Sequence, residues 1–236
     1  MHIKTVPIGR GLDWITEGFA LFRLNSLIWI VNVVIFICIA MLLSLLPLVG
    51  AIAAMLLQPV FVGGMLLGCR AQEQGQELRV EHLFDGFRQN TQALLLVGLL
   101  SGLAYLLAGL VAFMVAGGAL GLSVLGGLAD QQAFAMGEAM LGFVLSGLIG
   151  MALSVPIAMA TWFAPALVVF ENRQAVDALQ ASFTACLRNM LPFLLYGIVA
   201  LVLAALAMIP LGLGLLVLGP VLVASVYTGY RDIFAE

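Results

Sequence analysis

The carboxylates and the imidazole that could do chemistry gather in one polar segment, residues 70–92. These residues are Glu73, Glu77, Glu81, His82 and Asp85. The spacing of the last four would put several of them on one face of a helix. Such a set could bind a divalent metal or exchange protons. A solvated acidic face explains the same residues, and no GxSxG, HExxH or P-loop motif accompanies them. We therefore expect no enzyme activity, no metal site and no cofactor.

The cysteines do not indicate a metal or disulfide framework either. Cys38, Cys69 and Cys186 are odd in number and far apart in the chain. No CxxC pair or Cys/His cluster is present in the sequence. We expect free, partly buried thiols.

The composition indicates that the natural solvent of this chain is lipid. Of its 236 residues, 64% are hydrophobic and 9% are charged, whereas a soluble domain carries about 25% charged residues. A net charge of −3 provides no basic surface for nucleic acid. The apolar run from Leu24 to Leu46 is too long for a secretory signal, so we interpret it as a retained first helix.

Helices of about 20 apolar residues can cross the hydrocarbon core of a bilayer. Six stretches reach that length, at about 24–46, 50–69, 93–115, 140–164, 190–209 and 211–230. The glycine-rich segment 116–139 could extend the third helix, re-enter the membrane or lie at the outer surface.

The positive charges predict the orientation of these spans. Six crossings place all nine basic residues on one side: Lys4, Arg10, Arg23, Arg70, Arg79, Arg88, Arg173, Arg188 and Arg231. The positive-inside rule then puts both termini of this multi-pass protein in the cytoplasm. Losing one span would scatter these charges, so their agreement favours six.

An amphipathic segment precedes each odd-numbered span. The apolar residues recur at helical spacing, as Ile8, Leu12, Ile15, Phe19 and Phe22, then Val80, Leu83, Phe84 and Phe87, then Val176, Leu179, Phe183 and Leu187. Such helices lie in the headgroup plane with the apolar face toward the bilayer. We therefore expect a cytoplasmic interfacial helix before each pair of spans.

The even-numbered spans share a short sequence motif, which starts at Pro59, Pro165 and Pro220. Recurrence at one topological position predicts a threefold parallel repeat of surface helix, span, turn and span. The repeat units are about 8–70, 78–173 and 174–231, within a single integral membrane domain of residues 1–236. The predicted fold class is therefore all-α, with six transmembrane helices as three hairpins.

The three prolines predict helix kinks at matched depth, because each removes a backbone donor. Such kinks could shape a cavity or a gate, but bends that serve packing are the favoured interpretation. No Asp, Glu, Lys or Arg lies in the middle of a span, which counts against an ion-coupled transporter.

The leading functional hypothesis is a non-catalytic protein that binds membrane lipids or a partner membrane protein. Arg23, Arg88 and Arg188 directly precede spans, where basic side chains attract anionic headgroups. A role as topology determinants alone explains these three arginines equally well. The alternative function is a channel or facilitator for a small or amphipathic solute. Small residues at spacing four would also allow a second copy to pack on the spans.

Two stretches near the ends carry a resemblance to a known family. They are Thr5-Val6-Pro7, Gly9-Arg10-Gly11, Trp14, Glu17-Gly18-Phe19 and Leu21-Phe22-Arg23, and then Gly219-Pro220-Val221 and Tyr230-Arg231-Asp232-Ile233-Phe234. With these the chain resembles a family of small, uncharacterised proteobacterial inner-membrane proteins. The family is similar in plan to the six-helix membrane domain joined to some glycerophosphodiester phosphodiesterases. The resemblance implies membrane location and a six-helix fold, and it implies no activity or site residues.

Overall fold

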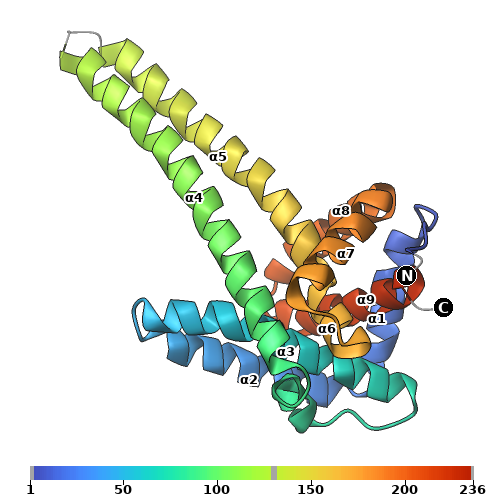
Figure 1. The fold of residues 1–236 in the computed structure, drawn as a ribbon. Helices are drawn as coiled ribbons and strands as arrows, with labels where there is room; N and C mark the ends of the chain where they lie inside the picture. The colour runs from blue at the N-terminus through green and yellow to red at the C-terminus, as the bar shows by residue number, and fades with distance from the viewer. Residues whose placement is uncertain (1–2, 129–131, 235–236) are drawn as a thin grey trace. The chain divides into compact units, whose positions relative to one another are not determined.

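The structure is a computed structural model that describes residues 3–128 and 132–234, with side chains outside 119–120 and 122–139 (Figure 1). Within these residues the elements are α1 Arg10–Leu24, α2 Ser26–Ser44, α3 Val49–Glu73, η1 Val80–Phe87, α4 Thr91–Leu128, α5 Gln132–Trp162, α6 Ala164–Glu171, α7 Ala175–Arg188, α8 Met190–Met208 and α9 Leu215–Phe234. All are α-helices except η1, which is a 3-10 helix, and the described residues contain no strand. The all-α prediction is therefore confirmed for the described chain.

Five stretches of helix in the described chain are long and apolar enough to cross a membrane. They are Ser26–Ser44, Val49–Glu73, Thr91–Gly118, Met140–Glu171 and Met190–Met208. Helix α9 is not among them, because Thr228, Arg231 and Asp232 make its second half polar. The prediction of six apolar spans is therefore not confirmed by length and composition.

The chain forms two compact units, Met1–Leu99 with Met159–Glu236, and Leu100–Ala158. The second unit is a helical hairpin made by the adjoining parts of α4 and α5 (Figure 1). In it a Cβ atom on Gly150 would lie 3.5 Å from the Ala112 side chain, whereas Phe113 and Phe143 are 73% and 77% exposed. Of the predicted segment 116–139, residues 116–128 extend α4 and 132–139 belong to α5, while 129–131 lie outside the described residues.

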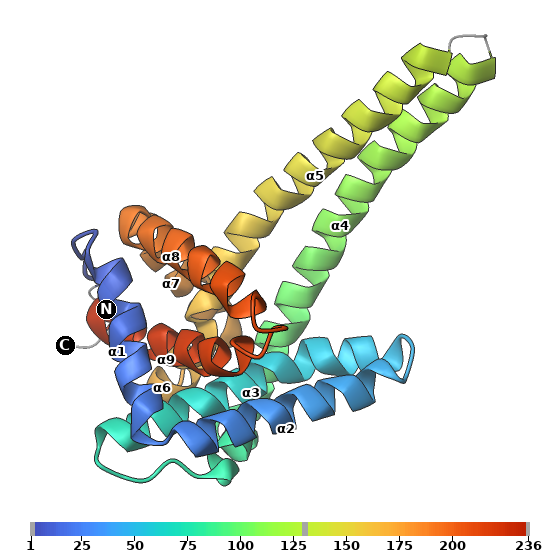
Figure 2. The same cartoon turned by 180° about the vertical axis from the view of Figure 1, so that it is seen from behind.

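In the first unit, α2 and α3 lie side by side as a hairpin, and so do α8 and α9 (Figure 2). The chain turns between α8 and α9 at Gly212, whose φ of +81° suits a residue without a Cβ. The largest fully buried side chains of this unit include Trp14, Trp29, Leu66, Leu83, Phe163, Leu167 and Ile233. These residues come from α1, α2, α3, η1, α6 and α9 and from the α5–α6 junction, so the core joins the two ends of the chain.

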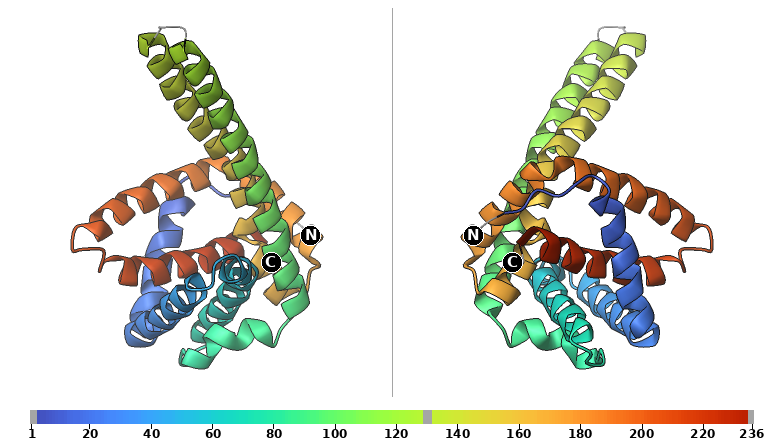
Figure 3. Two further views of the ribbon diagram at one scale, coloured as in Figure 1. Left: turned by 90° about the vertical axis from the view of Figure 1, so that its left-hand side faces the viewer. Right: turned by 90° about the vertical axis from the view of Figure 1, so that its right-hand side faces the viewer.

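The amphipathic elements pack closely on longer helices of the first unit. Helix α1 packs on α9, and η1 packs on α3 (Figure 3). A Cβ on Gly18 of α1 would lie 2.7 Å from the Val221 carbonyl oxygen, and a Cβ on Gly86 of η1 would overlap the Val60 carbonyl. Only glycine allows backbones to approach so closely, so both contacts depend on these two residues.

Helix α7 packs on α6, and this packing involves a polar contact, whereas the packing of α1 and η1 depends on glycines. The Ser182 hydroxyl lies in α7 and is fully buried. It accepts a hydrogen bond from the Phe163 N–H at 2.9 Å and donates one to the Met159 carbonyl at 2.7 Å. The hydroxyl thereby pairs backbone groups that the break between α5 and α6 leaves without helical partners.

The three prolines occupy different local positions. Pro59 lies within α3 and Pro220 within α9, and both are buried. Pro165 lies in the first turn of α6, directly after the break at Phe163, so it begins a helix instead of interrupting one. A further proline that the sequence analysis did not single out, Pro156, lies inside α5. A role of the predicted kinks in a cavity or gate stays a prediction.

The cysteines are free thiols in the described chain, as predicted. Cys69 and Cys186 are buried, and Cys38 is exposed.

Candidate functional site

The polar ends of α1, α3 and α9 meet in a network of ion pairs, which we call the charged cluster. Arg10 of α1 contacts Asp232 of α9 at 2.5 Å and Glu17 at 3.0 Å. Arg231 contacts the same Glu17 at 2.9 Å and also pairs with Glu73 at the end of α3. The hydrogen bond to Asp232 raises the pKa of the Arg10 guanidinium above its ordinary value, so the charge is retained. The cluster therefore ties the first helix to the last.

Buried polar side chains extend this network inward. The Trp14 indole is 1% exposed, and its Nε1–H donates to Asp232 at 2.8 Å. The Thr228 hydroxyl donates to the Trp14 carbonyl at 3.1 Å, and the Tyr227 hydroxyl donates to Glu73. In the sequence, Trp14 and Asp232 stood out only through the family resemblance. The helical spacing of Arg10, Trp14 and Glu17 could have predicted part of this network, because it puts all three on one face of α1.

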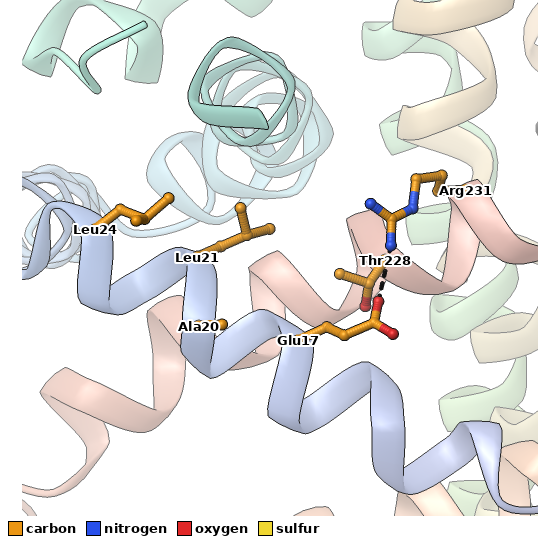
Figure 4. Close-up of a pocket in the computed structure, with 6 residues that line it drawn as sticks. All are labelled: Glu17, Ala20, Leu21, Leu24, Thr228 and Arg231. Atoms are coloured by element: carbon orange, nitrogen blue, oxygen red, sulfur yellow. Dashed lines mark hydrogen bonds and ion pairs between the residues drawn. The ribbon is translucent and has the colours of Figure 1, made fainter. Parts of the chain in front are cut away.

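An apolar pocket of about 240 Å³ adjoins the charged cluster between α1 and α9 (Figure 4). Its lining residues are Glu17, Ala20, Leu21, Leu24, Thr228 and Arg231. Figure 4 shows the ion pair between Glu17 and Arg231 beside this pocket. The pocket thus combines aliphatic side chains with Glu17 and Arg231, whose opposite charges already pair with each other.

A second pocket of about 250 Å³, the aromatic pocket, lies between the polar ends of α3, α6 and α9. Its lining residues are Arg70, Glu73, Phe170, Tyr227, Tyr230 and Arg231. The Arg70 guanidinium lies 5.5 Å from the centroid of the Phe170 ring, a cation–π distance. The Tyr230 ring is centred 5.0 Å from the Phe170 ring, so aromatic faces form much of the wall.

The predicted acidic face does not form one site in the structure. Glu73 ends α3 and joins the charged cluster, whereas Glu77 and Glu81 are exposed in the following loop and in η1. Asp85 pairs with Arg88 at 3.4 Å, and the His82 Nδ1 accepts the Arg79 N–H at 2.9 Å. Among the described residues, no His, Cys, Asp and Glu side chains gather as a metal-binding group.

The three arginines predicted to meet lipid headgroups lie on three separate elements. Arg23 is in the last turn of α1, Arg88 directly follows η1, and Arg188 ends α7. All three are exposed, and none lines the apolar or the aromatic pocket. The structure therefore keeps them apart and at the surface of the first unit.

Exposed apolar side chains stand next to these arginines. Leu24, Phe87 and Leu187 are 62%, 42% and 46% exposed. Each is the immediate chain neighbour of one of the three arginines. An exposed positive charge and an exposed large apolar side chain therefore occur together three times.

The predicted apolar faces of the interfacial elements are divided between core and surface. On α1, Ile15 and Phe22 are buried in the protein, whereas Leu12 and Phe19 are exposed, as is Ile8 just before the helix. On η1, Leu83 is fully buried but Phe84 and Phe87 are exposed, and on α7 Val176 and Leu187 are exposed. Helix α1 and η1 thus contribute part of their predicted apolar faces to the core, whereas α7 buries small residues such as Ala178 and Ala185 instead.

These features define a class of protein: an all-helical membrane protein whose apolar helices carry exposed aliphatic side chains. Among the curated proteins, a probable inner membrane protein of Burkholderia thailandensis is 32% identical over 231 residues, which cover 96% of this chain and 84% of that protein. The chain belongs to the same family as that protein. No model of a known protein family matches the chain, and no solved structure matches it. The similarity to the membrane domain joined to glycerophosphodiester phosphodiesterases stays a prediction.

Proposed function

We propose that this chain is a multi-pass inner-membrane protein with six crossings, of which α9 is the last, and with both termini in the cytoplasm. The polar end of α9 supports this topology, because Arg231 pairs with Glu73 at the polar end of the apolar helix α3. The Lys4 N–H also donates to the Ile233 carbonyl at 3.0 Å, which keeps the first and last segments together. Two helices with their charged ends together and their apolar parts aligned would cross the same bilayer.

The packing of the interfacial elements supports a threefold arrangement of hairpins in units of about 8–70, 78–173 and 174–231. Each interfacial element packs on the second helix of the preceding hairpin, with α1 on α9, η1 on α3 and α7 on α6. Gly18 meets Val221, directly after Pro220, and Gly86 meets Val60, directly after Pro59. A repeated unit, with the first copy packed on the last, would place these two contacts at the same position, directly after the proline.

Within this architecture, the function we propose is non-catalytic binding of anionic membrane lipids at the three interfacial elements. One observation carries it: each element ends in an exposed arginine whose chain neighbour is an exposed large apolar side chain, as at Arg23, Arg88 and Arg188. An anionic phospholipid offers the matching pair, a phosphate and an acyl chain. Each arginine would contribute about 1 kcal/mol near the headgroups, or roughly fivefold in local lipid occupancy.

The experiment is native mass spectrometry of the protein extracted with its surrounding lipids. A variant with Arg23, Arg88 and Arg188 all replaced by Gln is expected to retain about fivefold less anionic lipid than the wild-type chain. Arg79→Gln is the matched control, because Arg79 is exposed in the same polar segment but does not adjoin a span. Unchanged lipid content in a correctly inserted triple variant would refute the proposal, and a co-purifying protein would redirect it to partner binding.

The alternative, a channel or facilitator, needs an aqueous path through the bundle. In the first unit, α3, α6 and α9 contain side chains with no exposed surface, including Val60, Leu66, Leu167 and Ala224. Close packing of this kind supports a binding protein over a conducting one.

A further inference from the structure

The aromatic pocket is a second place at which this protein could hold a ligand, and its lining carries a net positive charge. Two arginines, Arg70 and Arg231, and one carboxylate, Glu73, line it, so the formal sum is +2 − 1 = +1. A positive lining disfavours a cationic ligand such as a quaternary amine, despite the aromatic walls. Because Glu17 and Glu73 already pair with Arg231, the positive charge left to meet an anion is that of Arg70.

The carboxylates around the pocket are already satisfied by internal donors. Glu73 receives hydrogen bonds from the Tyr227 hydroxyl and from Arg231. Glu171, which adjoins the pocket residue Phe170, receives the Tyr230 hydroxyl at 3.2 Å and pairs with Arg173 at 2.8 Å. With these hydroxyl protons donated to carboxylates, the tyrosines contribute aromatic walls and acceptor oxygens.

Arg70 differs from the other arginine in the pocket. Arg231 is held by Glu17 and Glu73, whereas none of the ion pairs between described residues involves Arg70. Its guanidinium instead lies over the Phe170 ring at 5.5 Å. This cation–π contact does not use the N–H groups of the guanidinium, and those groups match the oxygens of a phosphate in a bidentate manner.

We propose that the aromatic pocket binds a phosphate group, with Arg70 as the residue that contacts the phosphate oxygens. The volume of about 250 Å³ is slightly below the roughly 300–1,000 Å³ of pockets for drug-sized ligands, so it suits a phosphate with a small organic substituent. That phosphate belongs either to a lipid headgroup or to a small soluble phosphate ester. The site uses none of Arg23, Arg88 or Arg188, so it stands or fails independently of the lipid binding proposed above.

The test is a thermal-shift titration of the full chain in a phosphate-free maltoside detergent, at matched ionic strength. The probes are inorganic phosphate, glycerol 3-phosphate and short-chain phosphatidic acid. Arg70→Gln is the test variant, and Arg79→Gln, an exposed arginine outside the pocket, is the control. Because hydrogen bonds to a charged group are strong, Arg70→Gln is expected to weaken binding at least about tenfold.

The outcomes separate the two sources of phosphate. Stabilisation by the two water-soluble probes that is lost in Arg70→Gln supports a soluble ligand. Stabilisation by phosphatidic acid alone, again lost in Arg70→Gln, supports a lipid headgroup. No stabilisation by any probe, or equal stabilisation of Arg70→Gln and Arg79→Gln, overturns the proposal.

Discussion

Replacing Asp232 by Asn tests whether the charged cluster holds the first helix on the last. The Asp232 carboxylate accepts hydrogen bonds from Arg10 at 2.5 Å and from Trp14 at 2.8 Å, and its side chain is only 17% exposed. Both donors bind the same oxygen, Oδ2, so an Asn whose amide oxygen takes that place keeps both hydrogen bonds but removes the charge that strengthens them. Arg10 still pairs with Glu17 at 3.0 Å, which limits the damage.

The expected cost follows from these contacts. A hydrogen bond to a charged group contributes about 1.5–3 kcal/mol when one partner is removed. Residual exposure screens the charge, so the free energy of unfolding should fall by about 1–2 kcal/mol. For a chain of this length, that loss corresponds to a decrease in Tm of roughly 2–8 °C.

The assay is thermal unfolding in detergent, followed by tryptophan fluorescence, since the hydrogen bond of the Trp14 indole is one of the two that weaken. Asp177→Asn is the matched control, because Asp177 is an exposed carboxylate on α7 that makes none of the ion pairs between described residues. A Tm of Asp232→Asn equal to that of Asp177→Asn would refute the reasoning, because it would mean that the cluster contributes nothing to holding α1.

Two further predictions concern packing and topology. In Gly18→Ala the added Cβ would lie 2.7 Å from a carbonyl oxygen of α9, so we expect a loss of about 1–3 kcal/mol in thermal unfolding. Gly197→Ala is the control, because a Cβ added at Gly197 would have no neighbouring atom within 4 Å, and it should leave the Tm unchanged or raise it. Equal destabilisation of both variants would contradict the packing argument. In a cysteine-free background, Leu211→Cys, at a position that is 96% exposed between α8 and α9, should react with an impermeant maleimide from the outer face of spheroplasts. Gln76→Cys should react only after lysis, and labelling of both residues from the same side would exclude the proposed topology.

The helices of this protein were largely predictable from the sequence. Lipid cannot pair backbone N–H and C=O groups, so long apolar runs must be helical, and the first, second and fifth predicted spans correspond to α2, α3 and α8. Helix α9 was harder, because its polar residues pair with α1 and α3. Composition counts those residues against a span, while their partners are visible only in three dimensions.

The candidate sites were predictable to a different degree. Arg23, Arg88 and Arg188 are exposed in the structure, and their binding of lipid stays a prediction. The aromatic pocket was not predictable, since Arg70 and Phe170 are 100 residues apart in the chain. No local pattern links two such residues, and only the packing of α3 against α6 brings them together.

The sequence by itself determined that this is a helical membrane protein, because hydrophobic transfer and backbone pairing are local properties of each segment. Only the tertiary structure decided how the apolar faces of the interfacial elements are used. The periodicity of α1 cannot tell lipid from protein as the apolar environment, yet Phe22 is buried and Phe19 is exposed. The contact between Arg10 and Asp232, 222 residues apart, likewise arises only when the last helix packs on the first.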